Sequence, residues 1–248
     1  MSKKFLTRRI AIGCVILWQM SLAGYVIGET TTEYLPLTDG NFWTYSVTGT
    51  CGTYNFTVTV LQGTTTINGV PTKALYTSGG PDDKEVEYWT NDNNGIRLHG
   101  AYTPDTGIGP AWLYLEPPMV NARSTMTINE TVTSNGKATF IFNYYGTFIL
   151  NYESTSTIER LEAVAVPAGT YETVKVRDSM RIFGSILNQP YDDTSTGNTW
   201  LARDIGVVKE THMDVDCNEV SELISTNLKP PPTQLPARFL PFLPLLLD

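Results

Sequence analysis

Histidine is scarce in this 248-residue chain, and so are the motifs that would place a histidine in a catalytic site. Neither His99 nor His212 lies near a G-x-S-x-G sequence, so the local pattern of a serine hydrolase is missing. The glycine-rich segments lack the phosphate-loop spacing, which leaves nucleotide binding without support. We expect both histidines to be strand residues with solvent-facing rings. We predict no catalytic residue, no enzymatic activity and no cofactor.

Closely spaced metal ligands are also missing. Four side chains are of zinc-binding types but lie far apart in the sequence, namely Cys51, His99, His212 and Cys217. The turns at 91–95 and 191–198 are rich in oxygen donors, yet neither completes the spaced acidic loop of a hand-type calcium site. Asn and Asp are also good turn formers. We therefore predict no metal site.

Charged residues are few, at 17%, and the start of the chain has four basic residues but no acidic one. The first 23 residues, "MSKKFLTRRIAIGCVILWQMSLA", have a basic end, a short apolar run and then small residues at Ser21 and Ala23. This is the layout of a secretory signal peptide. The apolar run is about half of the roughly 20 residues that a spanning helix needs, which argues against a permanent transmembrane anchor. We expect an exported protein, periplasmic or extracellular.

Removal of the signal peptide makes the chain strongly acidic. Of the 17 basic residues four lie in the signal, so 13 remain against 25 acidic residues, a net charge of −12. A surface of this sign repels phosphate backbones, so we expect no nucleic-acid partner.

Only Cys51 and Cys217 of the three cysteines remain after Cys14 leaves with the signal. An even pair in an oxidising compartment favours a disulfide between these two residues. Two free buried thiols are the alternative, because the sequence does not show that the two sites are close.

Helical periodicity is absent after the signal, and alternation of polar and apolar residues is frequent. Tyr54, Phe56, Val58 and Val60 share one face of a predicted strand, and similar stretches recur along the chain. These stretches indicate an all-β, mainly antiparallel protein of about ten strands. Proline and glycine are dense in 101–125, where we expect a long connection with one short strand at 112–115.

The domain boundaries follow from changes in composition. We predict a signal peptide at 1–23, a leader at 24–33, a single β domain at 34–228 and a Pro-rich, apolar, disordered tail at 229–248. The tail is too short and too interrupted by proline to span a bilayer.

Aromatic residues form the remaining candidate site. Phe140, Phe142 and Tyr144 alternate along one predicted strand, with Phe148 on the next and Trp200 elsewhere. Plain core packing explains this pattern, because a sheet needs to bury one face. The alternative is that these five residues line a surface that binds an apolar ligand.

Three stretches together resemble a known group of proteins. They are "YLPLTDGNFWTYSVTG", "VPAGTYETVKV" and "TWLARDIGVVKETHMDV", in this order. Their arrangement is similar to an uncharacterised family of bacterial exported proteins, a domain of unknown function akin to the LolA/LolB-like superfamily. The resemblance implies a curved sheet or half-barrel with an apolar concave side, and no catalytic residue.

The sequence and the resemblance together predict an envelope protein that binds an apolar or lipidic molecule without catalysis. A structural or protein-interaction module of the envelope is the first alternative. A carbohydrate-active enzyme is the second.

Overall fold

Antiparallel strands account for nearly all of the structure in this computed structural model, which describes residues 26–104 and 109–229. The predicted signal peptide at 1–23 lies outside the described residues, as does the predicted tail after Lys229. The predicted leader contains strand β1 (Val26–Thr30) and a short 3-10 helix, η1 (Thr31–Glu33). No helix in the described ranges is long and apolar enough to cross a bilayer.

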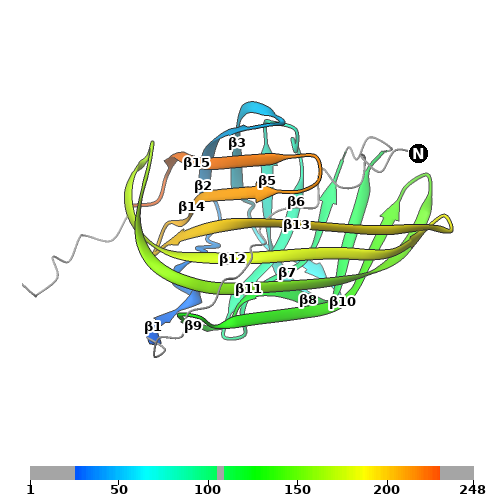
Figure 1. The fold of residues 1–248 in the computed structure, drawn as a ribbon, viewed down its shortest axis with the longest axis horizontal. Coiled ribbons are helices and arrows are strands. Elements are labelled where there is room, and N and C mark those ends of the chain that lie inside the picture. Colours follow the sequence, from blue (N-terminus) through cyan, green and yellow to red (C-terminus); the bar gives the residue numbers. More distant parts are fainter. Residues whose placement is uncertain (1–25, 105–108, 230–248) are drawn as a thin grey trace, which may run out of the picture.

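The described ranges form two sheets. The smaller pairs β1 with β9 (Thr125–Thr127). The larger has 13 strands: β2 (Phe42–Gly49), β3 (Gly52–Val60), β4 (Thr65–Ile67), β5 (Val70–Ser78), β6 (Val86–Asp92), β7 (Gly95–Thr103), β8 (Ala111–Ala122), β10 (Thr131–Phe142), β11 (Gly146–Val166), β12 (Gly169–Ile186), β13 (Gln189–Ala202), β14 (Gly206–Met213) and β15 (Asn218–Thr226). Figure 1 shows that β11, β12 and β13 are long strands that run across the whole molecule.

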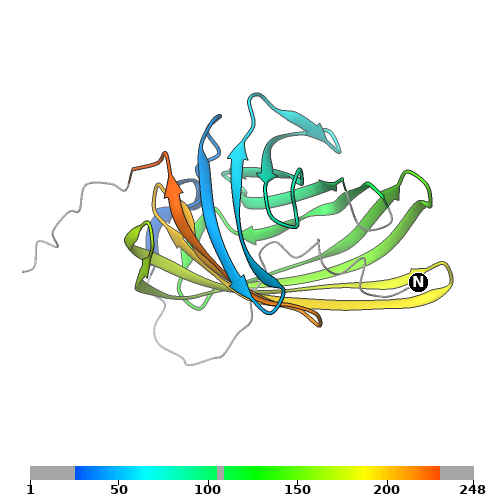
Figure 2. The same cartoon turned by 90° about the horizontal axis from the view of Figure 1, so that it is seen from above.

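The large sheet closes on itself into a barrel. β3 pairs with β2 and also with β5, and β2 pairs with the last strand, β15. Every strand of this sheet except β4 therefore belongs to a closed ring, which Figure 2 shows from above. The prediction of an all-β, antiparallel, curved sheet is confirmed. The strands are more numerous than expected. The sequence also does not predict that the ring closes, because pairings between strands far apart in sequence leave no local signal.

Turn chemistry explains where the strands reverse. Asn68 and Gly69 connect β4 to β5, and both have the positive φ that a tight hairpin turn requires, 48° and 79°. Pro167 and Ala168 connect β11 to β12, where Val166 pairs with Gly169. The stretch "VPAGTYETVKV" therefore forms a hairpin corner.

Strand β8 is longer than the sequence indicates. We expect a short strand at 112–115, but β8 runs on to Ala122 through Pro117 and Pro118. The two prolines lie where β8 is unpaired: its pairing with β10 covers Ala111 to Glu116, and its register with β7 shifts between Tyr114 and Met119. Proline lacks an N–H, so it is tolerated at an irregularity of this kind.

Candidate ligand-binding cavity

A cavity of about 200 Å³ lies inside the barrel. Strands on opposite sides of the ring provide its wall, including β2, β3, β5, β6, β12, β13, β14 and β15. Most of the wall is apolar or aromatic, with contributions from Leu35, Trp43, Tyr45, Tyr54, Phe56, Val58, Leu75, Trp89, Ile96, Ala122, Val176, Leu201 and Val207. A cavity of this size is far larger than the space that one water molecule needs.

Strand alternation places these side chains inside the ring. On β2, Trp43, Tyr45 and Val47 are buried while the residues between them are half-buried. On β3, Tyr54, Phe56 and Val58 stand opposite β2 residues in the antiparallel register, and the rings of Tyr45 and Phe56 stack with centroids 5.1 Å apart. This pair of strands supplies an aromatic wall.

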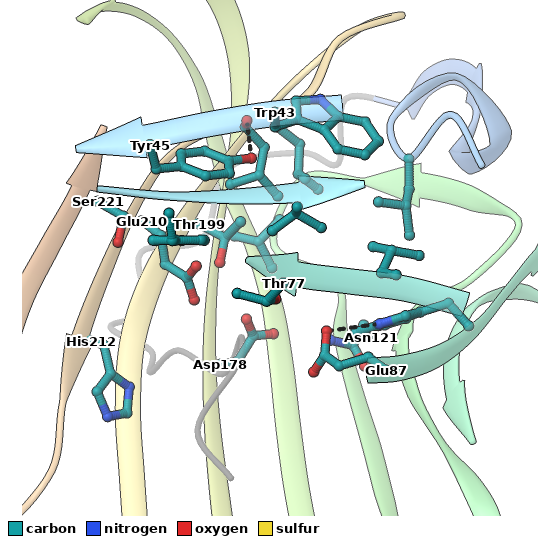
Figure 3. Close-up of a pocket in the computed structure, with 18 of the residues that line it drawn as sticks. Trp43, Tyr45, Thr77, Glu87, Asn121, Asp178, Thr199, Glu210, His212 and Ser221 are labelled. Carbon is teal, nitrogen blue, oxygen red and sulfur yellow. Dashed lines mark hydrogen bonds between the residues drawn. The ribbon is translucent and has the colours of Figure 1, made fainter. Parts of the chain in front are cut away.

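Hydrogen bonds to backbone carbonyls hold two rings of this wall. The indole Nε1 of Trp43 donates to the carbonyl of Ile205, and the hydroxyl of Tyr45 donates to the carbonyl of Val207 at 2.9 Å. Burial raises the pKa of Tyr45 well above its usual value, so this hydroxyl keeps its proton. Both polar groups are thus engaged, and the rings present carbon to the cavity (Figure 3).

Two buried carboxyl groups interrupt the apolar wall. Glu87 lies on β6 and Asp178 lies on β12. Burial raises the pKa of Glu87 to about 8, although a 3.0 Å hydrogen bond from the indole of Trp89 to its Oε2 opposes the shift. Burial also raises the pKa of Asp178 well above its usual value, and the charge of Glu210 adds to both shifts. Both carboxyl groups are therefore mainly protonated at neutral pH.

Two oxygen atoms on the wall are buried without a hydrogen bond. Asp178 is 3% exposed and interacts with Ser156, but its Oδ1 has no partner among the described residues. Thr199, on the neighbouring strand, is 9% exposed, and its Oγ1 also lacks one within the described part of the chain. Figure 3 shows both side chains on the cavity wall. A buried polar atom without a partner is costly, so such an atom in a cavity marks a place for a ligand group.

Basic side chains lie elsewhere. Lys and Arg are missing from the described cavity wall, whose titratable residues are Tyr45, Tyr54, Asp82, Glu87, Asp178, Glu210, His212 and Glu219. Lys175 and Arg177, next to Asp178 on β12, point to the other face of the sheet, where both contact Glu159. The ring of His212 contacts Asp214 at 3.1 Å. The cavity is therefore acidic in character.

The structure divides the five residues that the sequence suggests as ligand-binding, and none of them lines this cavity. Phe140 and Phe142 are buried in the main apolar cluster, where Phe148 packs against them. Tyr144 is 82% exposed in the turn between β10 and β11. Packing among neighbouring strands accounts for the three phenylalanines.

Trp200 faces away from the cavity. It follows Thr199 on β13, and alternation puts it on the outer face. Its Nε1 donates a 2.6 Å hydrogen bond to Glu162, and the ammonium groups of Lys175 and Lys209 lie 5.4 Å and 5.9 Å from its ring centroid. These contacts give Trp200 a place in a polar cluster on the outside of the barrel.

His99 also differs from the sequence expectation. We expect a solvent-facing ring, but His99 is 2% exposed and its Nε2 lies 2.9 Å from the hydroxyl of Thr90. Burial lowers the pKa of His99, so the ring is neutral. The neighbouring strands that cover His99 are set by long-range pairing, which the stretch "GIRLHG" does not indicate.

The predicted disulfide is present. Cys51, in the β2–β3 turn, bonds to Cys217, just before β15, with Cα atoms 5.5 Å apart. The antiparallel pairing of β2 with β15 brings the two cysteines together, since Gly49 stands opposite Glu219. Glu219 lies close to both sulfur atoms, but the sulfurs are bonded to each other rather than available to a metal.

The acidic cavity residues have a sequence signal that could have revealed them. The inward positions of β12 are Val174, Val176, Asp178, Met180 and Ile182, all of them buried. A single carboxylate within an apolar series of period two marks a buried polar site. The strands that close the ring have no such signal in the sequence. They come from both ends of the chain, with β2 and β3 near the start and β14 and β15 near the end.

Comparison with known proteins identifies no family. No family model matches the chain, and no curated protein matches it. A solved structure described as a putative lipoprotein from Parabacteroides distasonis has 13% sequence identity and a TM-score of 0.42, and covers 80% of this chain and 99% of its own. A putative exported protein with a YmcC-like fold from Bacteroides fragilis has 13% identity and a TM-score of 0.42. The match covers 78% of this chain and 98% of that protein's chain. The resemblance to the LolA/LolB-like superfamily stays a prediction.

Proposed function

We propose that the protein is a non-catalytic binding protein of the cell envelope and holds a small, mainly apolar or lipidic molecule inside the barrel. The observation that carries this proposal is the cavity itself, with its mainly apolar wall and its two unpartnered polar atoms. Ligand sites in proteins are typically concave and apolar with a few well-placed polar groups. Barrels of moderate size commonly enclose such sites.

The apolar wall supplies the driving force. Transfer of each buried CH₂ group of a ligand from water is favourable by about 0.8 kcal/mol. Rigid strands hold Trp43, Tyr45 and Phe56, so the wall needs little rearrangement on binding. Binding of an apolar molecule therefore costs little reorganisation of the cavity wall.

Hydrolysis of a sugar fits this site less well. A glycosidase places two carboxyl groups across a cleft that also holds water and the hydroxyl groups of the sugar. Here the wall is mainly carbon, and burial raises the pKa of both Glu87 and Asp178, whereas a glycosidase pair needs one ionised member. These features favour binding over catalysis.

Uptake of a neutral apolar dye tests the proposal. N-phenyl-1-naphthylamine becomes fluorescent in apolar surroundings, and we expect saturable binding to the mature protein. Val58→Phe narrows the cavity and should lower the affinity about tenfold. Thr53→Phe, at an exposed position of the same strand, is the matched control and should bind as wild type does. Absence of saturable binding, or equal binding by Val58→Phe, would refute the cavity as the site.

Export is tested separately. Expression of the full chain in a bacterial host should give a protein that lacks residues 1–23 and is found outside the cytoplasm. Intact mass spectrometry of the fractions identifies the mature N-terminus. A full-length protein in the cytoplasm would contradict the envelope location while leaving the cavity proposal in place.

A further inference from the structure

Most polar groups of the cavity wall are carboxyl or hydroxyl groups. Across β12, β13, β14 and β15 they form a continuous series on the inner wall, since Thr199 stands opposite Glu210 and Glu210 stands opposite Ser221. Asp178 lies two residues from Val176, the cross-strand partner of Thr199. Each of these side chains offers an oxygen atom, and none of them carries a positive charge.

The opposite wall repeats this character. Glu87 lies on β6 with Thr77 on the adjacent β5, and both line the same cavity as Glu210 (Figure 3). The one described donor to the Glu87 carboxyl group is the indole of Trp89. Carboxyl groups thus approach the cavity from two directions, and the described wall has no Lys or Arg to balance them.

Aromatic faces complete the surroundings of these carboxyl groups. Trp43, Tyr45, Phe56 and Trp89 all line the same space. Aromatic faces attract cations, and buried cation–π contacts are stronger than exposed ones. Acidic oxygens together with aromatic rings form the usual surroundings of an organic ammonium group.

We propose that the ligand is an organic cation, an apolar molecule with a protonated amine, whose ammonium group binds the unpartnered Oδ1 of Asp178 and Oγ1 of Thr199. This inference rests on the proposed function and names the ligand class for the same cavity. An ammonium group offers up to three N–H donors, and the two orphaned oxygens are acceptors. The apolar body lies against the aromatic wall of β2 and β3.

Binding of a cation should also change the protonation state of Asp178. Asp178 and Glu87 hold protons in the empty cavity because burial disfavours their charged forms. An ammonium group reverses this preference, so Asp178 releases its proton to the buffer as the cation enters. The titratable groups that face this event from neighbouring strands are Tyr45, Tyr54, Asp82, Glu87, Glu210, His212 and Glu219.

Three ligands with one apolar chain and different head groups test the inference. Hexylamine is a cation near pH 7, hexanol is neutral and hexanoate is an anion. Isothermal titration of the wild-type protein should give the tightest binding for hexylamine, by about tenfold over hexanol, and no measurable binding of hexanoate. Titration in two buffers with different ionisation enthalpies should show proton release for the amine alone.

A neutral substitution then identifies the carboxyl group. Asp178→Asn keeps the shape and should lower the hexylamine affinity about tenfold or more, with hexanol changed less than about threefold. Glu222→Gln, on the outer face of β15 where Glu222 pairs with Lys209, is the matched control and should leave all three affinities unchanged. If Asp178→Asn does not fold, Glu87→Gln is the second variant, and it should also lower the hexylamine affinity.

The outcomes separate the two proposals. If hexanol binds as tightly as hexylamine, or if Asp178→Asn leaves the amine affinity unchanged, the cavity remains a binding site and the cation inference is wrong. If neither hexylamine nor hexanol binds, and the neutral dye does not bind either, both proposals are wrong.

Discussion

The indole Nε1 of Trp89 donates a 3.0 Å hydrogen bond to Oε2 of Glu87, two residues earlier on the same strand and on the same side of the sheet. This bond favours the carboxylate, but burial has the larger effect and keeps the carboxyl group protonated to a pKa of about 8. Glu87 is therefore an acid whose neutral form is favoured by folding, and this has a measurable effect on stability.

The free energy of unfolding should fall as the pH rises from 4.5 to 8. In this range the unfolded chain loses the Glu87 proton while the folded chain keeps it, at a cost on the order of 4 kcal/mol. Urea midpoints at about pH 5.5 and about pH 7.5 measure the fall, and Glu87→Gln should show a smaller one. Asp178 also makes the free energy of unfolding fall with rising pH, and it does so equally in the wild type and in the variant. Equal slopes for the two proteins would contradict the prediction.

Loss of the disulfide should destabilise the barrel without changing its fold. The bond between Cys51 and Cys217 closes a loop with a sequence separation of 166, for which chain entropy gives a loss of up to about 5 kcal/mol on removal. Urea unfolding of Cys51→Ser/Cys217→Ser should match that of the reduced wild type. A reductant should have no effect on the double variant, which serves as the control.

Tyr152→Phe should destabilise the protein by about 1–3 kcal/mol. The Tyr152 side chain is fully buried, and its hydroxyl donates a 2.6 Å hydrogen bond to the carbonyl of Pro117 on β8. Removal of the hydroxyl leaves that carbonyl without its donor. Tyr144→Phe, at an exposed turn, is the control for loss of a tyrosine hydroxyl and should be neutral. A neutral Tyr152→Phe would show that the Pro117 carbonyl finds another donor.

Two matched leucine substitutions should separate core packing from ligand binding. Phe142→Leu, in the main apolar cluster, should lower stability by about 1 kcal/mol and leave dye affinity unchanged. Phe56→Leu, on the cavity wall, should weaken dye binding. Fluorescence titration with urea unfolding of the same samples distinguishes the two effects. Weaker binding by Phe142→Leu would restore the phenylalanine cluster as a ligand site.

Much of the fold is predictable from sequence because its strands are locally regular. Alternation reveals β2 and β3, and Asn68–Gly69 reveals the turn between β4 and β5. Strand β8 shows the limit of this reasoning, since Pro117 and Pro118 indicate a break in sequence but are accommodated at unpaired positions. Whether a proline interrupts a strand depends on its neighbours, which a single sequence does not show.

The candidate site was harder to predict than the fold. Aromatic clustering favoured Phe140 and its neighbours, yet these rings pack against one another and fill the interior. The cavity instead depends on Asp178, which the alternation of β12 places inside, and on Trp43 from the other end of the chain. Only the closed ring brings them to one space. Composition along a strand therefore predicts burial, whereas the cavity wall depends on pairing between strands far apart in sequence.

The pairing of β2 with β15 has a consequence for biosynthesis. The first strand of the ring must wait for the last, because Trp43 stands opposite Thr226. No nascent chain that still lacks β15 can contain the finished cavity, and contacts this distant in sequence form slowly. The cavity therefore becomes complete only after the C-terminal strand has been made and docked.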